Sequence, residues 1–171
     1  QAEHGPGGIS GLVTTSKKLA DDVSTIVEEL VPSLERGEII AEVLEQGGFI
    51  YLVESMEAAI EFANRFSPEH IEVLSEVPEE VADRLNNCGL VLLGPYSPVS
   101  STDYCIGVNH VLPTEGYAKV SSGITVLDYT KPVSTVKASK TGLAAIKERV
   151  AALAESEGLP NHKEAVEERF R

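Results

Sequence analysis

Three short apolar runs separated by helical patterns constrain the fold of this chain most strongly. The runs are Phe49–Val53, Ile71–Leu74 and Leu90–Leu93. Continuous hydrophobicity over so few residues is typical of strands buried on both faces of a parallel sheet. The segments between the runs carry helix signals, so the order is β-α-β-α-β. This order predicts an α/β layer architecture.

Helix start and stop signals flank these runs. Serine or proline stands at several of the expected first turns, and glycines close several of the patterns. Residues 1–15 are expected to form a loop, 119–128 to contain one more strand, and 130–139 to be extended or turn-like. The expected helices are 16–34, 38–46, 55–66, 78–86, 142–157 and 161–171, the last capped by Asn161.

Two regions follow from this pattern. Residues 1–130 are expected to form an α/β core, an incomplete Rossmann-like layered sheet. Residues 131–171 form a C-terminal helical appendage. The two helices of this appendage are too amphipathic to stand alone, so they need a surface to cover, either on this chain or on a partner.

The charge balance excludes some classes of partner. The chain has 14 lysines and arginines against 27 aspartates and glutamates, a net charge of -13. Such a field repels nucleic acids and anionic membranes, and the basic residues form no stripe. No apolar stretch is long enough to cross a membrane, and the first residues do not resemble a signal peptide. Cys88 and Cys105 have no metal-type spacing and are expected to be buried free thiols, which fits a reducing cytoplasm.

A polar loop at 97–116 stands out by its length. A structureless loop of roughly twenty residues in a compact domain is often functional. It contains Asp103 and His110. Taken alone, an aspartate in such a loop is usually a cap or turn residue, and a histidine there usually bonds to the backbone.

The four histidines lie beside carboxylates, amides or turn prolines. Gln1 and His4 are three residues apart, so on a helical turn they would share a face and could bind one ion; the alternative is a frayed terminus. Glu69–His70 could supply two acid–base groups, although neighbours within a strand point to opposite faces unless the backbone turns. The alternative is a surface pair, and Glu72 nearby is expected to be solvated.

Several strings together resemble the histidinol dehydrogenase family, and the resemblance covers essentially the whole chain. They are Gln1–His4 (Gln-Ala-Glu-His), Ser67–His70 (Ser-Pro-Glu-His), Asp103–Tyr104, Asn109–Thr114 (Asn-His-Val-Leu-Pro-Thr), and Glu157 with His162. The resemblance implies a zinc-dependent, NAD-linked cytoplasmic homodimer that oxidises L-histidinol to L-histidine in two steps through an aldehyde.

The resemblance also implies roles for individual residues. His70 matches the main acid–base residue, and Glu69 matches the group that activates water. Gln1, His4, Asp103 and His162 match the zinc ligands. His110 and Glu157 match substrate contacts, and the implied substrate-binding set is Gln1, His4, His70, Asp103, His110, Glu157 and His162. In the family, the segment carrying Glu157 and His162 reaches the site of the other subunit.

The chain departs from the family in length. Members are more than twice as long, and the part not found here is the N-terminal half with the dinucleotide-binding region. No G-x-G-x-x-G follows a strand, so no residue of this chain is assigned to NAD. Ser101–Thr102 also stands where the family usually has Ala-Gly. Two hypotheses follow: the C-terminal portion of a histidinol dehydrogenase, inactive without an N-terminal partner, or a stand-alone metal- or ligand-binding domain without redox chemistry.

Overall fold

The computed structural model describes all residues from 1 to 171, and the chain divides into two compact units. Unit 1 comprises Gln1–Tyr129 and unit 2 comprises Thr130–Arg171. Unit 1 contains every strand and unit 2 is helical. None of the helices combines the length and the apolar character that a bilayer crossing requires.

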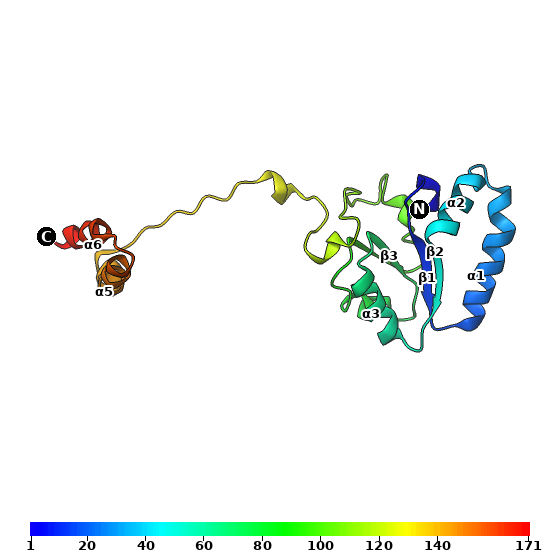
Figure 1. The fold of residues 1–171 in the computed structure, drawn as a ribbon, viewed down its shortest axis with the longest axis horizontal. Coiled ribbons are helices and arrows are strands. Elements are labelled where there is room, and N and C mark those ends of the chain that lie inside the picture. The colour runs from blue at the N-terminus through cyan, green and yellow to red at the C-terminus, as the bar shows by residue number, and fades with distance from the viewer. The chain divides into compact units, whose positions relative to one another are not determined.

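The first sheet of unit 1 has two parallel strands. Strand β1 (Ser10–Thr14) pairs with β2 (Gly48–Leu52), in a register that aligns Ser10 with Gly48 and Thr14 with Leu52. Helices α1 (Lys17–Leu30) and α2 (Gly37–Gly47) form the crossover, with a 3₁₀ turn, η2 (Val31–Ser33), between them. Both helices contact both strands and lie on one side of the sheet (Figure 1).

The second sheet follows α3 and is also parallel. Helix α3 (Met56–Phe66) leads to β3 (His70–Val73), and α4 (Pro78–Ala82) leads to β4 (Leu90–Leu93). The register aligns His70 with Leu90 and Val73 with Leu93. The buried core of this half consists of Ile60, Val73 and Val81, with Leu85, Val91 and Leu93 packed against it.

The mixed α/β architecture with parallel strands is confirmed, and so are two helix caps. The Ser16 hydroxyl accepts a hydrogen bond from the Leu19 amide at 3.2 Å, and the Ser55 hydroxyl accepts one from the Ala58 amide at 3.2 Å. Each serine satisfies an amide that the helix itself leaves without a partner. Helix α4 is shorter than expected and ends at Ala82.

Strand β1 lies where a loop was expected, and glycine explains the error. A Cβ atom added at Gly11 would lie 2.5 Å from the Phe49 ring, so the close packing of Phe49 on β1 requires glycine there. In the sequence this glycine, one of several in the first 11 residues, reads as a loop signal. Gly11 therefore looks like a loop residue in the sequence, but in the fold it is a strand residue that makes room for a ring.

The expected burial of the strands is wrong for β2. Ile50, Tyr51 and Leu52 are between 38% and 53% exposed. The strands form two separate two-stranded sheets, in which β1 and β3 each pair on one edge only. These three side chains alternate between the two faces of β2, so both faces are partly exposed, although Tyr51 packs on Phe62 of α3, with ring centres 5.2 Å apart.

The strand expected within 119–128 is also absent. Two 3₁₀ turns occur there instead, η4 (Tyr117–Lys119) and η5 (Val126–Tyr129). Val120 is 83% and Val126 is 81% exposed, so the alternating side chains have no sheet to pack on. Alternation predicts a strand only where a partner strand is available.

Unit 2 is a pair of helices preceded by an extended, exposed segment. Residues 130–139 form neither helix nor strand. Helix α5 (Lys140–Ser156), capped by Ser139, packs on α6 (Pro160–Glu167), and a last 3₁₀ turn, η6 (Glu168–Phe170), follows. Pro160, rather than a capping Asn161, begins α6, which is a favourable first position for proline.

Side chains also tie α6 back onto α5. Lys163 donates a hydrogen bond to Glu155, which raises the pKa of Lys163 above its ordinary value. The Lys147 ammonium lies 5.4 Å from the centre of the Phe170 ring. Both contacts hold the end of the chain against α5.

Candidate active site

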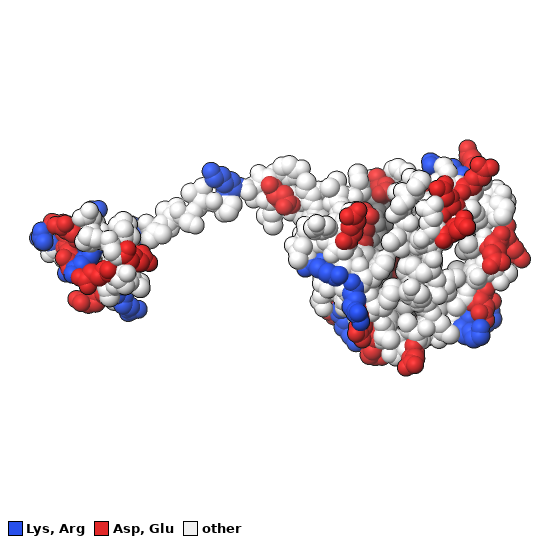
Figure 2. Space-filling view, viewed as in Figure 1, with Lys and Arg blue, Asp and Glu red and all other residues white.

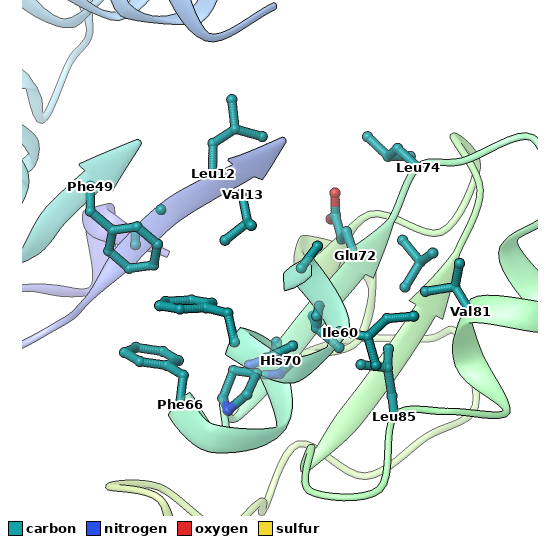
Figure 3. Close-up of a pocket in the computed structure, with 18 of the residues that line it drawn as sticks. Leu12, Val13, Phe49, Ile60, Phe66, His70, Glu72, Leu74, Val81 and Leu85 are labelled. Atoms are coloured by element: carbon teal, nitrogen blue, oxygen red, sulfur yellow. The ribbon is translucent and has the colours of Figure 1, made fainter. Parts of the chain in front are cut away.

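A cleft of about 570 Å³ in unit 1 lies between the two sheets. The facing strands β1 and β3 contribute residues 9–13 and 70–75, and α3 and the Phe49 ring close one side. Figure 3 shows the apolar lining, with His70 at the beginning of β3 and Glu72 further along the same strand. Gln1 and Val99 also line this cleft, so it brings together residues from the N-terminal turn, β3 and the polar loop.

His70 is the buried titratable residue of this cleft. Its side chain is 8% exposed, and Nε2 is buried without a hydrogen-bond partner within the protein. Pairing of β3 with β4 holds the backbone at this point, because the Leu90 amide donates to the Glu69 carbonyl at 2.8 Å. An unsatisfied buried polar nitrogen costs about 1–3 kcal/mol, and a polar group of a ligand that bonded to Nε2 would recover that cost.

Glu69 lies beside His70 because the backbone bends just before the strand. Residue 69 is a bend and β3 begins at residue 70, so strict strand alternation does not separate the two side chains. Glu69 Oε1 lies 4.0 Å from His70 Nδ1, and the glutamate side chain is 37% exposed. The pair therefore combines a buried imidazole with a carboxylate that is open to solvent.

The N-terminal turn brings His4 to the polar loop. The His4 amide donates to the Gln1 carbonyl at 3.1 Å, which closes the 3₁₀ turn η1 (Ala2–His4). In such a turn, side chains three residues apart lie one above the other. His4 Nε2 is 3.8 Å from Asp103 Oδ2, although the two residues are far apart in the sequence.

This arrangement fits a zinc ion on the chemistry and spacing of its donors. Imidazole nitrogen and carboxylate oxygen are ordinary zinc ligands. Two ligands of a tetrahedral zinc ion, each about 2.0–2.1 Å from the metal, lie about 3.4 Å apart, close to the observed 3.8 Å. No group of three His, Cys, Asp or Glu side chains is gathered in this way. Within unit 1 the predicted ligands that are brought together are His4 and Asp103, with Gln1 one turn away.

The polar loop that carries Asp103 is anchored more firmly than its sequence suggests. Thr102 is 2% exposed, and its hydroxyl donates to the Val99 carbonyl at 2.7 Å. Glu72 is exposed, as expected, and its carboxylate also accepts a hydrogen bond from the Val99 amide at 2.7 Å. Val99 begins the 3₁₀ turn η3 (Val99–Ser101), and Thr102 follows this turn directly.

The end of the polar loop near His110 packs closely against the backbone at Gly89. A Cβ atom at Gly89 would lie 2.6 Å from the Glu69 carbonyl oxygen and 3.3 Å from Pro113 Cδ. Gly89 thus allows the end of the Asn109–Thr114 string to pack beside the Glu69 turn. His110 itself is exposed and does not line the cleft.

A buried serine ties the end of α3 to the same region. Ser67 is 2% exposed and has a left-handed backbone, with φ of 60°. Its hydroxyl donates to the Gly116 carbonyl at 3.3 Å. This conformation ends α3 and turns the chain towards Glu69 and His70.

Glu157 and His162 belong to unit 2. Glu157 caps the end of α5 and His162 lies in the first turns of α6, and both are exposed. The structure therefore places both residues in unit 2, at the end of α5 and the start of α6. Their predicted roles at a shared site stay predictions.

The two cysteines differ, and the prediction that both are buried is wrong for Cys105. Cys105 is exposed, whereas Cys88 is half-buried and burial raises the pKa of its thiol. Because the thiolate is the reactive form, we expect Cys105 to react with a water-soluble disulfide reagent roughly tenfold or more faster than Cys88. Absorbance of the released thiolate measures both rates. Cys105→Ser should remove only the fast phase, and two equally fast phases would contradict the assignment.

Charge around the site follows the composition. Figure 2 shows acidic side chains spread over the visible face of unit 1, with few basic ones among them. The whole chain has a net charge of -13, and a field of that sign favours cations over anions.

Comparison with known proteins decides the family. A model of the histidinol dehydrogenase family matches residues 1–170. The chain belongs to the histidinol dehydrogenase family. Histidinol dehydrogenase from Methanosarcina mazei is 44% identical over 170 residues, which cover 99% of this chain and 39% of that protein. The histidinol dehydrogenase of Methanocaldococcus jannaschii is 42% identical over 171 residues, covering 100% of this chain and 39% of that protein.

A solved structure agrees with the family assignment. The crystal structure of histidinol dehydrogenase from Elizabethkingia anophelis superposes with a TM-score of 0.93 at 34% sequence identity, covering 99% of this chain and 39% of that chain. The chain thus spans about two fifths of the length of these histidinol dehydrogenases.

Some residues that shape the candidate site were not foreseen from the sequence. Ser67, Gly89 and Thr102 act through buried backbone contacts, and Glu72 acts through a backbone amide far along the chain. The one available signal was closeness in sequence: Ser67 and Glu72 lie within three residues of His70, and Thr102 precedes Asp103.

Proposed function

We propose that this chain is the C-terminal portion of a histidinol dehydrogenase and supplies much of its catalytic surface. The reaction is the NAD-linked oxidation of L-histidinol to L-histidine through the aldehyde, a step of histidine biosynthesis. The observation that carries the proposal is the buried His70 Nε2 without a protein partner, in a cleft that Gln1 also lines. The contact of His4 with Asp103, one turn from Gln1, supports it.

Proton transfer is the task proposed for His70. Each oxidation removes a hydride from carbon to NAD and a proton from the attached hydroxyl. An imidazole exchanges protons near neutral pH, so His70 can accept the hydroxyl proton. In the second oxidation water adds to the aldehyde, and we assign the proton of that water to the Glu69 carboxylate, which lies 4.0 Å from His70.

Substrate orientation is the task proposed for the other residues. Gln1, His4 and Asp103 would hold zinc, with His162 as a fourth ligand. These residues would present zinc to the imidazole and amine of histidinol, and the metal would supply an orienting template for the substrate. His110 and Glu157 are proposed as substrate contacts, and no residue of this chain is assigned to NAD.

A homodimer is proposed because unit 2 carries Glu157 and His162, two residues that the proposal assigns to the site of unit 1. Residues 130–139 are exposed and extended, and ten such residues span up to about 35 Å. Apolar side chains along the chain from Val126 to Val136 are 72–90% exposed. Such a segment fits one that lies on a neighbouring subunit and delivers Glu157 and His162 to its site.

We propose that the layered fold is completed by a part of the polypeptide outside these 171 residues. Strands β1 and β3 line one apolar cleft and each has a free edge. We infer that the rest of the polypeptide completes a single Rossmann-like sheet at these free edges. A cytoplasmic setting belongs to the same proposal, and the two free thiols fit it.

Complementation tests this function. The chain alone is expected to form no NADH from L-histidinol and NAD. Adding the remaining three fifths of the Methanosarcina mazei relative, produced separately, should restore NADH formation, which is followed by absorbance. That remainder alone is the control.

Two outcomes would contradict the proposal. Full activity of the chain alone would show that the NAD site lies within it. Tight binding of zinc and histidinol, with no NADH formed in any mixture with a complementary portion, would favour a stand-alone binding domain.

A further inference from the structure

The Glu72 carboxylate holds the backbone of the loop that carries Asp103. Its Oε1 atom accepts a hydrogen bond from the Val99 amide at 2.7 Å, across 27 positions of sequence. Val99 is the first residue of η3, where a turn leaves its amides without internal partners. Hydrogen bonds from an amide to a carboxylate are shorter and stronger than those between neutral groups.

Glu72 has no other evident task. It forms no ion pair with a lysine, arginine or histidine, and its carboxylate points into the cleft (Figure 3). It stands two positions after His70 on β3, so both side chains leave the same face of the strand. One strand therefore carries the proposed acid–base residue and the anchor of the loop.

The turn from Val99 to Asp103 links the Glu72 hydrogen bond to the position of Asp103. The Thr102 amide and hydroxyl both donate to the Val99 carbonyl, at 2.9 Å and 2.7 Å. Thr102 is 2% exposed, so this turn is fixed by packing as well as by bonding. Asp103 follows directly, and its Oδ2 lies 3.8 Å from His4 Nε2.

We propose that Glu72 is a positioning residue, which places the Asp103 carboxylate beside His4 by holding Val99. The inference rests on the proposed zinc role of His4 and Asp103. Glu72 itself touches neither metal nor substrate. It acts through a single backbone hydrogen bond and one tight turn.

Substitution of Glu72 tests this in the chain complemented by the rest of the polypeptide. Glu72→Ala is expected to weaken zinc binding about 10- to 100-fold, as loss of a group that orients a metal ligand does. Glu72→Gln keeps an oxygen that can accept from Val99, so it should stay within about threefold of the parent. Zinc dissociation constants come from competition with a chromogenic chelator. Glu76→Ala, an exposed glutamate four positions on, removes the same charge and should change nothing.

A second readout does not depend on zinc. Amide hydrogen exchange of residues 99–103 should accelerate in Glu72→Ala and not in Glu72→Gln or Glu76→Ala. In an Asp103→Ala background, Glu72→Ala should cause no further loss of zinc affinity, because the residue it positions is gone.

The outcomes separate this inference from the proposed function. Unchanged exchange and unchanged zinc affinity in Glu72→Ala would overturn the positioning role. So would a further loss of affinity in the Asp103→Ala background. Zinc affinity that is insensitive to Asp103→Ala would instead contradict the proposed metal site, while the exchange measurement would still decide whether Glu72 holds the loop.

Discussion

Replacing His70 with asparagine is expected to lower the turnover of the complemented enzyme by about 10²- to 10⁴-fold, the range that removal of a general base produces. The ring is buried, and its Nε2 has no protein partner, so this nitrogen is the one available to the substrate hydroxyl. Asparagine places an amide near the position of Nδ1 and leaves nothing at Nε2. Steady-state NADH formation measures the loss.

A second variant and a binding measurement guard this prediction against simple misfolding. His70→Gln can place an amide near Nε2 and should keep the fold, yet an amide does not accept a proton near neutral pH. Both variants are expected to keep histidinol binding, weakened by about tenfold at most because one hydrogen bond is lost, as calorimetry would measure. Near-parental turnover in either, with the circular dichroism spectrum of the parent, would remove His70 from the proton-transfer role.

Mixing two zinc-deficient variants is expected to restore part of the metal. His4→Ala and His162→Ala should each bind little zinc in the complemented enzyme, without loss of fold, because both side chains are exposed. If His162 comes from the neighbouring subunit, a mixed dimer has one site with both histidines and one with neither. Random exchange of subunits should then return about a quarter of the parental zinc, as the symmetry of a twofold dimer requires.

Metal analysis after gel filtration gives the zinc content, and each unmixed variant is the control. Subunits are mixed under mild denaturant and returned to buffer so that exchange reaches equilibrium. Zinc that stays at the level of the unmixed variants would show that each chain keeps its own His162. Parental zinc in His162→Ala alone would remove that residue from the ligand set.

Local signals account for most of the secondary structure that could be predicted. Ser16 and Ser55 mark helix starts through a hydrogen bond to a nearby amide, which depends on neighbours in sequence alone. Strand β1 was missed because the reason for Gly11 is a ring contributed by β2. The division into two sheets was likewise unpredictable, since strand pairing is set by distant residues rather than by periodicity.

In the candidate site, too, the features set by neighbouring residues could be predicted and those set by distant contacts could not. The spacing of Gln1 and His4 predicts a shared face, and the structure closes that turn. The approach of His4 to Asp103 is a product of the whole fold of unit 1 and has no local signal. Glu72 could not be singled out, because its partner is a backbone amide and any residue at position 99 except proline offers the same donor.

The partial exposure of the β2 side chains changes what a stability measurement on this chain would mean. Ile50, Tyr51 and Leu52 keep a third to a half of their surface in water here. Truncating one of them removes only the contacts already made, so the measured loss of unfolding free energy understates its weight wherever a further surface covers it. The same substitution would thus be mild in the chain by itself and severe in an assembly, and the difference between the two values would report the coupling free energy between this chain and whatever completes its sheet.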